Sequence, residues 1–321
     1  MDTAIVRHAG GIDRVGELAD RARDFANAAR ADATLSAYSA DWRHWEQWAR
    51  GHGTEVLPAS AEAVALYITD MSTGLKPATI SRRLSAISVA HQNAGYQSPT
   101  KDALVRSVMT GIRRGLGVAP KQVAPVTIGE IRKMVARMGN TTIDLRDRAI
   151  LLLGFAGAFR RSELVSLDVG DLADSPDGLL VTVRRSKRDQ EGRGDTKAIP
   201  FGSDPETCPV RALRAWLDSA TIETGPVFRS VDRHSNIGTA RLSDKAVSLV
   251  VKRAAERSDL DPGLYAGHSL RAGFVTTAAA NGASERAIAR QTGHAPGSAT
   301  MRTYIRHNSA FIDNAVSIVG L

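Results

Sequence analysis

The chain has 321 residues and a formal net charge of +8, because 42 Lys and Arg stand against 34 Asp and Glu. This length predicts two domains that can each bury a core, and the basic balance favours a polyanionic partner, although charge alone is weak support for one. Cys208 is the only cysteine and no apolar stretch reaches the roughly eighteen residues of a membrane span, so we expect a cytoplasmic protein in a reducing compartment, with no disulfide framework and no membrane anchor.

Residues 12–114 predict an all-helical bundle, because apolar side chains recur there at helical spacing. Helices are expected at 12–29, 33–48, 60–71, 77–93 and 101–114. Ser60 has the chemistry of an N-cap, and Pro77 is a typical first residue of a helix. Four aromatic side chains form one stripe on the second helix, which we interpret as core packing: Tyr38, Trp42, Trp45 and Trp48.

Charge is unevenly divided within this helical region. Residues 1–73 carry seven basic and eleven acidic side chains, a net charge of −4, whereas residues 74–121 carry eight and one, a net charge of +7. The basic part is therefore the expected face for a nucleic acid. The fourth predicted helix, 77–93, and the residue before it carry a short hydroxyl side chain among basic side chains, as helices that read the DNA major groove do. Ordinary exposure to solvent explains each single basic side chain about as well. The candidate contacts are Lys76, Thr79, Arg82 and Arg83.

Residues 115–125 have the composition of a linker, with small residues, two prolines and one candidate phosphate contact, Lys121. Residues 126–321 then predict a mixed α+β domain with a small antiparallel sheet, within a chain that is mainly α. Helices are expected at 127–138, 144–156, 209–220, 243–258 and 309–321, and strands at 169–172, 179–183 and 198–201. A polar loop, 185–197, joins the last two strands. Arg241 and Lys245 are further candidates for phosphate contacts.

The stretch 268–307 gathers side chains suited to phosphate chemistry. His268 and Arg271 are three residues apart and share one face of a helix. A short helix from Ser284 to Gly293 places His294 at its end, and a second helix from Ser298 carries Tyr304. Taken singly, the tyrosine is best explained as a core aromatic and each histidine as a structural one. Together they supply an oxygen nucleophile and cations that can hold a phosphodiester.

The ordered set resembles the tyrosine recombinase (phage integrase) family. The resemblance rests on three motifs near the end of the chain: His268-Ser-Leu-Arg271, Thr292-Gly293-His294 and Tyr304-Ile305-Arg306. It also rests on an upstream motif from Gly157 to Leu164 that contains Arg160. The family's lysine is matched by Lys187 in the run 183–187, and Lys197 is the less favoured competitor. The two-domain length is most similar to that of the Cre recombinase-like members.

This resemblance implies a helical, SAM-like core-binding domain at 12–114 and a catalytic domain at 126–321 related to type IB topoisomerases. It implies strand exchange on double-stranded DNA through a 3′-phosphotyrosine on Tyr304, with no cofactor, metal or ATP. His268 would accept the proton, Arg160 and Arg271 would grip the phosphate with His294, and Lys187 would protonate the leaving oxygen. It also implies a dimer on each site, a synaptic tetramer, and docking of residues 309–321 on a neighbouring subunit.

One departure from the family pattern concerns the spacing before the nucleophile. Tyr304 lies ten positions after His294, whereas nine is common in the family, so this departure affects the assignment of His294.

Three other classes compete with this interpretation. A DNA-binding regulator without catalysis would use 284–304 as a helix-turn-helix, but leaves Arg160 and Lys187 unexplained. A relaxing topoisomerase would share the whole site. A metal hydrolase built on His268, His294 and His307 is the weakest alternative, because no carboxylate cluster accompanies the histidines.

Overall fold

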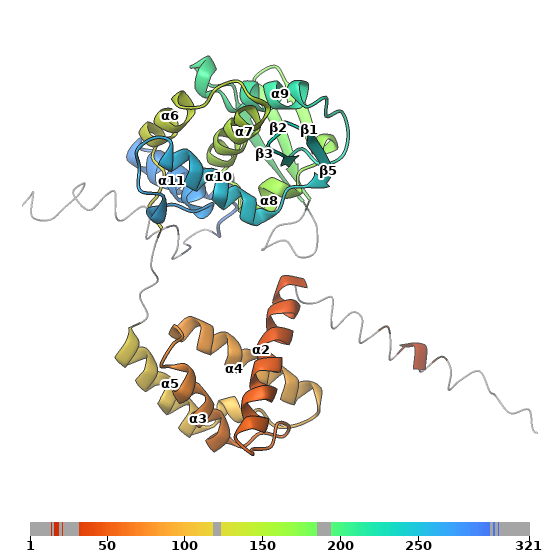
Figure 1. Ribbon diagram of the computed structural model, residues 1–321, viewed down its shortest axis with the longest axis vertical. Helices are drawn as coiled ribbons and strands as arrows, with labels where there is room; N and C mark the ends of the chain where they lie inside the picture. The colour runs from red at the N-terminus through yellow and green to blue at the C-terminus, as the bar shows by residue number, and fades with distance from the viewer. Residues whose placement is uncertain are drawn as a thin grey trace, which may run out of the picture. The chain divides into compact units, whose positions relative to one another are not determined.

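The computed structural model describes residues 14, 16–18, 21, 32–117, 123–184, 194–295, 298 and 301. The chain divides into two compact units, Met1–Lys121 and Gln122–Leu321, drawn in Figure 1. The division falls within the stretch 115–125 that has the composition of a linker. Across the described part of the chain, no helix combines the length and apolarity needed to cross a lipid bilayer.

The described part of the first unit is built from helices, which are α2 (Asp32–Gly51), α3 (Ala61–Met71), α4 (Pro77–Asn93) and α5 (Ala103–Leu116), with a 3-10 turn at Pro99–Lys101. The four helices predicted over these residues are confirmed with bounds shifted by at most three positions. The predicted helix 12–29 lies outside the described residues except for a few positions that are helical. Ser60 caps α3 as predicted, since its side chain accepts a hydrogen bond from the Ala63 amide.

The core of the first unit is aromatic. Trp45 and Tyr67 are fully buried, their rings are 5.1 Å apart and meet edge to face, and Trp48 stacks on Trp45. The predicted aromatic stripe of α2 is therefore confirmed as core packing for Trp45 and Trp48, with Trp42 partly buried against them, whereas Tyr38 lies outside this cluster. Helix α2 packs against α4, and α3 packs against α5.

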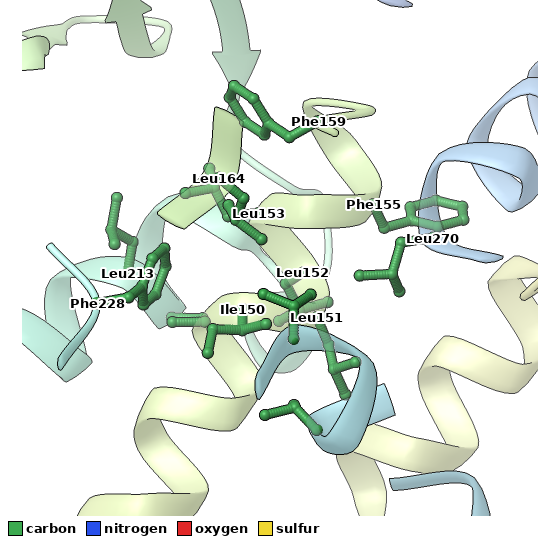
Figure 2. Close-up of a cluster of buried hydrophobic side chains, with 14 of the residues drawn as sticks. Ile150, Leu151, Leu152, Leu153, Phe155, Phe159, Leu164, Leu213, Phe228 and Leu270 are labelled. Atoms are coloured by element: carbon green, nitrogen blue, oxygen red, sulfur yellow. The ribbon is translucent and has the colours of Figure 1, made fainter. Parts of the chain in front are cut away.

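The second unit contains α6 (Ile128–Ala136), α7 (Thr142–Ala156), α8 (Arg161–Ser166), α9 (Pro209–Ser219), α10 (Asp244–Glu256), α11 (His268–Ala280) and α12 (Glu285–Thr292). Helix α7 lies at its centre and packs against α9, α10 and α11. Its apolar run is buried on nearly every side, so Leu151 and Leu153 have no exposed surface. Figure 2 shows this cluster, with Leu270 of α11 and Phe228 among the contributing side chains. A helix that is apolar all round in this way serves as the core of its domain.

A three-stranded antiparallel sheet flanks these helices in the order β1 (Leu172–Ser175), β2 (Gly178–Val183) and β3 (Asp195–Pro200). The predicted strand at 169–172 is wrong for most of its length, because Val169–Asp171 forms a 3-10 turn and β1 begins at Leu172. The Asp171 carboxylate accepts a hydrogen bond from the Asp168 amide at 2.8 Å, which closes that turn instead of extending the chain. A second, two-stranded sheet, β4 (Arg229–Val231) with β5 (Ile237–Arg241), was not predicted.

The chain at 123–126 runs along the start of α11 and the 3-10 turn before it, Pro262–Leu264, and is hydrogen-bonded to both. The Ala124 amide donates to the Leu264 carbonyl at 2.8 Å, and the Val126 amide donates to the Ser269 carbonyl at 3.0 Å. Gly273 makes this approach possible, because a Cβ at that position would lie 1.8 Å from the Val126 carbonyl oxygen. The backbone that follows the linker is thus fixed directly on α11.

Candidate active site

The turn between α7 and α8 carries Arg160 on a tightly folded backbone. Gly157 ends α7, and a Cβ there would lie 2.0 Å from an atom of the Phe159 ring. Ala158 has a φ of 46°, the left-handed region that a residue with a Cβ seldom adopts. The folding of the turn leaves the carbonyls of Gly157 and Ala158 to accept hydrogen bonds from side chains of other elements.

Arg160 is held by a buried carboxylate. One oxygen of Glu163 accepts the Arg160 backbone amide at 2.9 Å, and the other pairs with the Arg160 guanidinium. The side chain of Glu163 is 3% exposed and that of Arg160 is 21% exposed. A guanidinium has five N–H donors, so this carboxylate can orient Arg160 while other donors stay available to an anion.

Arg271 joins α11 to the same turn. It is 2% exposed, and its Nη1 donates to the Ala158 carbonyl at 2.7 Å. His268 is the first residue of α11, one helical turn before Arg271. The predicted placement of His268 and Arg271 on one helix is confirmed, and the contact with Ala158 brings that helix beside Arg160.

The environment of His268 favours the uncharged form of its imidazole. The side chain remains open to solvent, but partial desolvation of the ring lowers the pKa of His268. Positive charge lowers this pKa further, from the guanidiniums of Arg271, Arg161 and Arg160. A neutral imidazole at pH 7 can accept a proton. Arg161 was not singled out from the sequence. It lies at this position because its Nη1 donates to the Ser248 hydroxyl at 3.1 Å.

Lys197 lies in β3, where it pairs with Val181, and not in the polar loop to which the sequence assigned it. It is 4% exposed, and its ammonium donates to the carbonyls of Gly157 at 2.8 Å and Gln291 at 2.7 Å. Burial lowers the pKa of Lys197 to about 8, against the opposing effect of the Glu163 carboxylate. The structure therefore places Lys197 beneath the Arg160 turn.

The end of α12 completes this arrangement. The Gln291 side-chain amide donates to the Ala156 carbonyl at 3.0 Å and to the Ala198 carbonyl at 3.3 Å. Gly293 then stops the helix with a left-handed φ of 64°, as its place in the sequence predicts, and His294 follows it. The sequence analysis did not predict the hydrogen bonds of Gln291, because no local sequence pattern distinguishes a glutamine that binds distant carbonyls from one exposed on a short amphipathic helix.

Several predicted positions lie outside the described residues. They are the candidate nucleophile Tyr304, the favoured lysine Lys187, the linker residue Lys121 and the segment 309–321. Their roles remain predictions.

The candidate DNA contacts on α4 differ in their surroundings. Lys76 is exposed and Thr79 is half-buried. Arg82 lies 2.7 Å from the Asp41 carboxylate with 44% of its side chain exposed. Arg83 is turned inward, since 14% of its side chain is exposed and its Nη1 donates to the Tyr67 hydroxyl at 3.2 Å. Arg83 is thus engaged by its own domain.

The two candidates near the start of α10, Arg241 at the end of β5 and Lys245 in the first turn of α10, also differ. Arg241 donates to the carbonyls of Val165 at 2.7 Å and Leu167 at 3.0 Å, and it pairs with Asp168, so it braces the end of α8. Lys245 is exposed. Within the described residues no three side chains of the His, Cys, Asp or Glu type gather as a metal site.

Comparison with known proteins identifies relatives along nearly the whole chain. The sequence profile described as "Phage integrase family" matches residues 126–310. An integrase/recombinase xerD homolog of Selenomonas ruminantium is 40% identical over 310 residues, which cover 95% of this chain and 91% of the relative. The tyrosine recombinase XerD of Corynebacterium glutamicum is 25% identical over 274 residues, or 81% of this chain and 83% of the relative.

Solved structures share the fold at lower sequence identity. A lambda integrase dimer bound to a COC′ core site matches with a TM-score of 0.59 and 16% identity, over 89% of this chain and 75% of that one. The XerH site-specific recombinase in its post-cleavage complex with a palindromic difH substrate matches with a TM-score of 0.58 and 14% identity, over 89% and 78%. These likenesses confirm the predicted fold class, a mainly helical chain with a small antiparallel sheet.

Proposed function

Because this chain belongs to the phage integrase family of tyrosine recombinases, we propose that it breaks and rejoins DNA through a covalent ester on Tyr304. The chain is a site-specific DNA recombinase. The observation that supports the assignment of the site is the convergence of Arg160 and Arg271 on one turn, with His268 on the same helix as Arg271.

The first step is an in-line attack on a backbone phosphorus. A tyrosine ordinarily ionises near pH 10, so Tyr304 gives its proton to the neutral imidazole of His268 as its oxygen attacks. The bond between phosphorus and the 5′-oxygen breaks, and Lys187 protonates the leaving oxygen. The products are a 3′-phosphotyrosine and a free 5′-hydroxyl.

The guanidiniums of Arg160 and Arg271 bind the non-bridging oxygens, whose negative charge grows in the transition state, and His294 adds a hydrogen bond. By analogy with oxyanion-hole donors, loss of either arginine costs roughly 3 kcal/mol of transition-state stabilisation. The ester stores the energy of the broken bond. A 5′-hydroxyl from a partner duplex therefore reverses the reaction and joins exchanged strands without ATP or a cofactor.

The partner is double-stranded DNA. The lambda integrase structures with the same fold are described as complexes with a core site and with a Holliday junction. Exposed Lys76 and Lys245 are suited to backbone phosphates, and Lys121 is proposed for the same role. Thr79 and Arg82 are the proposed base-reading pair of α4. The inward contacts of Arg83 favour a supporting role there.

Assembly on DNA is proposed to use an apolar cavity of about 490 Å³ in the second unit. Its lining includes Ile128, Phe155, Phe274 and Ile288. The segment 309–321 carries an apolar stripe at helical spacing, and we propose that it docks in this cavity of a neighbouring subunit. Dimers on each site would then pair as a tetramer. A lambda integrase of the same fold is described as a tetramer on a Holliday junction, with a TM-score of 0.57. We propose that the protein acts in the cytoplasm, at the nucleoid, where its DNA substrate would lie.

The test incubates the full chain with nicked duplex oligonucleotides that tile the DNA flanking its own gene. A nick just beyond the scissile phosphate lets the freed fragment diffuse away and traps the intermediate. We expect a protein–DNA band on a denaturing gel, undiminished by EDTA and absent with Tyr304→Phe. A band that persists in Tyr304→Phe would refute the nucleophile. Binding with no band for any duplex would favour a regulator, and relaxation of a plasmid that lacks the trapped sequence would favour a topoisomerase.

A further inference from the structure

A buried lysine with no assigned chemical task lies under the proposed site. Lys197 extends from β3 into the protein, and its ammonium donates to the carbonyl oxygens of Gly157 and Gln291. It also lies 4.7 Å from the centroid of the Phe159 ring. Placing a cation at 4% exposure costs free energy, so this position needs compensation from its surroundings.

The compensation comes from two helix ends. Gly157 is the C-cap of α7, and Gln291 is in the last turn of α12. The carbonyls at a helix C-terminus have no partner within the helix and carry partial negative charge, and a cation placed there is favourable. A single ammonium thus binds the C-terminal ends of α7 and α12 and holds both against β3.

Each of these ends leads directly into a residue of the proposed site. Three residues after Gly157 the chain reaches Arg160, and three residues after Gln291 it reaches His294. The separation of these two phosphate-binding groups therefore depends on the contacts made by Lys197. The Gln291 amide strengthens the same junction through its bonds to the carbonyls of Ala156 and Ala198.

We propose that Lys197 is a positioning residue that sets the spacing between Arg160 and His294, and that it is not the acid that protonates the leaving oxygen. This inference rests on the proposed function. Its ammonium is directed at two backbone carbonyls beneath the turn, whereas a general acid must reach the leaving oxygen of the substrate. Positioning of this kind has large kinetic effects, since a shift of about 1 Å can cost roughly 100-fold in rate.

The test measures single-turnover formation of the covalent adduct by the full chain on the trapped duplex. Lys197→Met should lower the cleavage rate about 100-fold, with little change in DNA affinity. Lys133→Met, at an exposed lysine of α6, is the matched control and should cleave at the wild-type rate. A wild-type adduct in the same gel shows that the proposed function holds, so a failure of this inference is separable from a failure of the function.

Two readouts distinguish positioning from acid catalysis and from a loss of stability. If Lys197 acts through Arg160, the two substitutions Lys197→Met and Arg160→Ala must be non-additive, and the double variant should fall no more than about fivefold below Arg160→Ala alone. A substrate with sulfur at the 5′-bridging position needs no acid, because a thiolate leaves readily. It should rescue Lys187→Met and not Lys197→Met. Additive losses, or rescue of Lys197→Met, would overturn the proposal.

A milder variant covers the case in which Lys197→Met does not fold. Gln291→Leu keeps the buried ammonium and its two carbonyl partners and removes only the amide's bonds to Ala156 and Ala198. We expect about a tenfold loss of cleavage that is again non-additive with Arg160→Ala. An additive loss, or no loss, would show that the junction of α7, α12 and β3 does not set the spacing between Arg160 and His294, and would overturn the proposal.

Discussion

The crossing of residues 123–126 over α11 gives the sharpest prediction, through Gly273→Ala. A methyl group at residue 273 would lie 1.8 Å from the Val126 carbonyl oxygen and 2.7 Å from the Val126 carbonyl carbon. These are backbone atoms that no side-chain rotation can move away. The segment must therefore lift from the helix and lose the 3.0 Å bond from the Val126 amide to the Ser269 carbonyl.

The magnitude follows from three contributions. Overpacking costs about 1–3 kcal/mol, and contact with backbone places this case at the upper end. The lost hydrogen bond costs about 1 kcal/mol, and the better helix propensity of alanine returns about the same amount. The net loss of about 3 kcal/mol corresponds to a fall in Tm of roughly 6–12 °C for a unit of this size. Cleavage should fall as well, because α11 carries His268 and Arg271.

Thermal unfolding followed by circular dichroism, together with the adduct assay, checks this reasoning. Gly129→Ala is the matched control, because its Cβ would meet nothing closer than the Thr127 hydroxyl at 3.9 Å. That variant should unfold at or slightly above the wild-type temperature. A Tm for Gly273→Ala within about 2 °C of wild type would refute the claim that the segment is fixed on α11.

Three further outcomes are expected. Glu163→Gln should lower cleavage about 10- to 100-fold in the single-turnover assay, because it removes the charge that orients Arg160; an unchanged rate would contradict that role. The pKa of His268 is lowered below its usual 6.5, so the cleavage rate should fall with decreasing pH with a midpoint below pH 6.5, and His268→Gln should abolish that fall; a midpoint at or above pH 6.5 would contradict the lowered pKa. Ser60→Ala should lower the stability of the first unit by about 1 kcal/mol in a denaturant titration, whereas Ser72→Ala, at the other end of α3, should have a smaller effect.

The helices were the most predictable part of this protein. Their starts and stops are local, as Ser60 and Gly293 show, and their apolar faces repeat along the sequence. The short strands were harder, since the turn at Asp168 and Asp171 depends on a side-chain hydrogen bond that competes with an extended chain. The two-stranded sheet of β4 and β5 has three- and five-residue strands with little apolar alternation.

The sequence predicted the candidate site as a set of residues and not as an arrangement, and the roles of that set remain predictions. Arg160, His268 and Arg271 were found through the family motifs that contain them. The sequence analysis did not predict the burial of Lys197. Side chains alternate between the two faces of a strand, so the apolar Ile199, two residues later, indicates that Lys197 faces inward as well. Contacts such as that of Arg271 with the Ala158 carbonyl join distant segments, and no local pattern reports them.

The hydrogen-bond acceptors of the Lys197 ammonium are main-chain atoms, which has a genetic consequence. Any amino acid placed at residue 157 or 291 still offers a carbonyl, so mutation of those codons cannot delete the acceptors themselves. No reciprocal charge swap is available to compensate for a changed lysine. A selection for revertants of Lys197→Met should therefore recover the original lysine codon and yield no second-site changes at either partner codon.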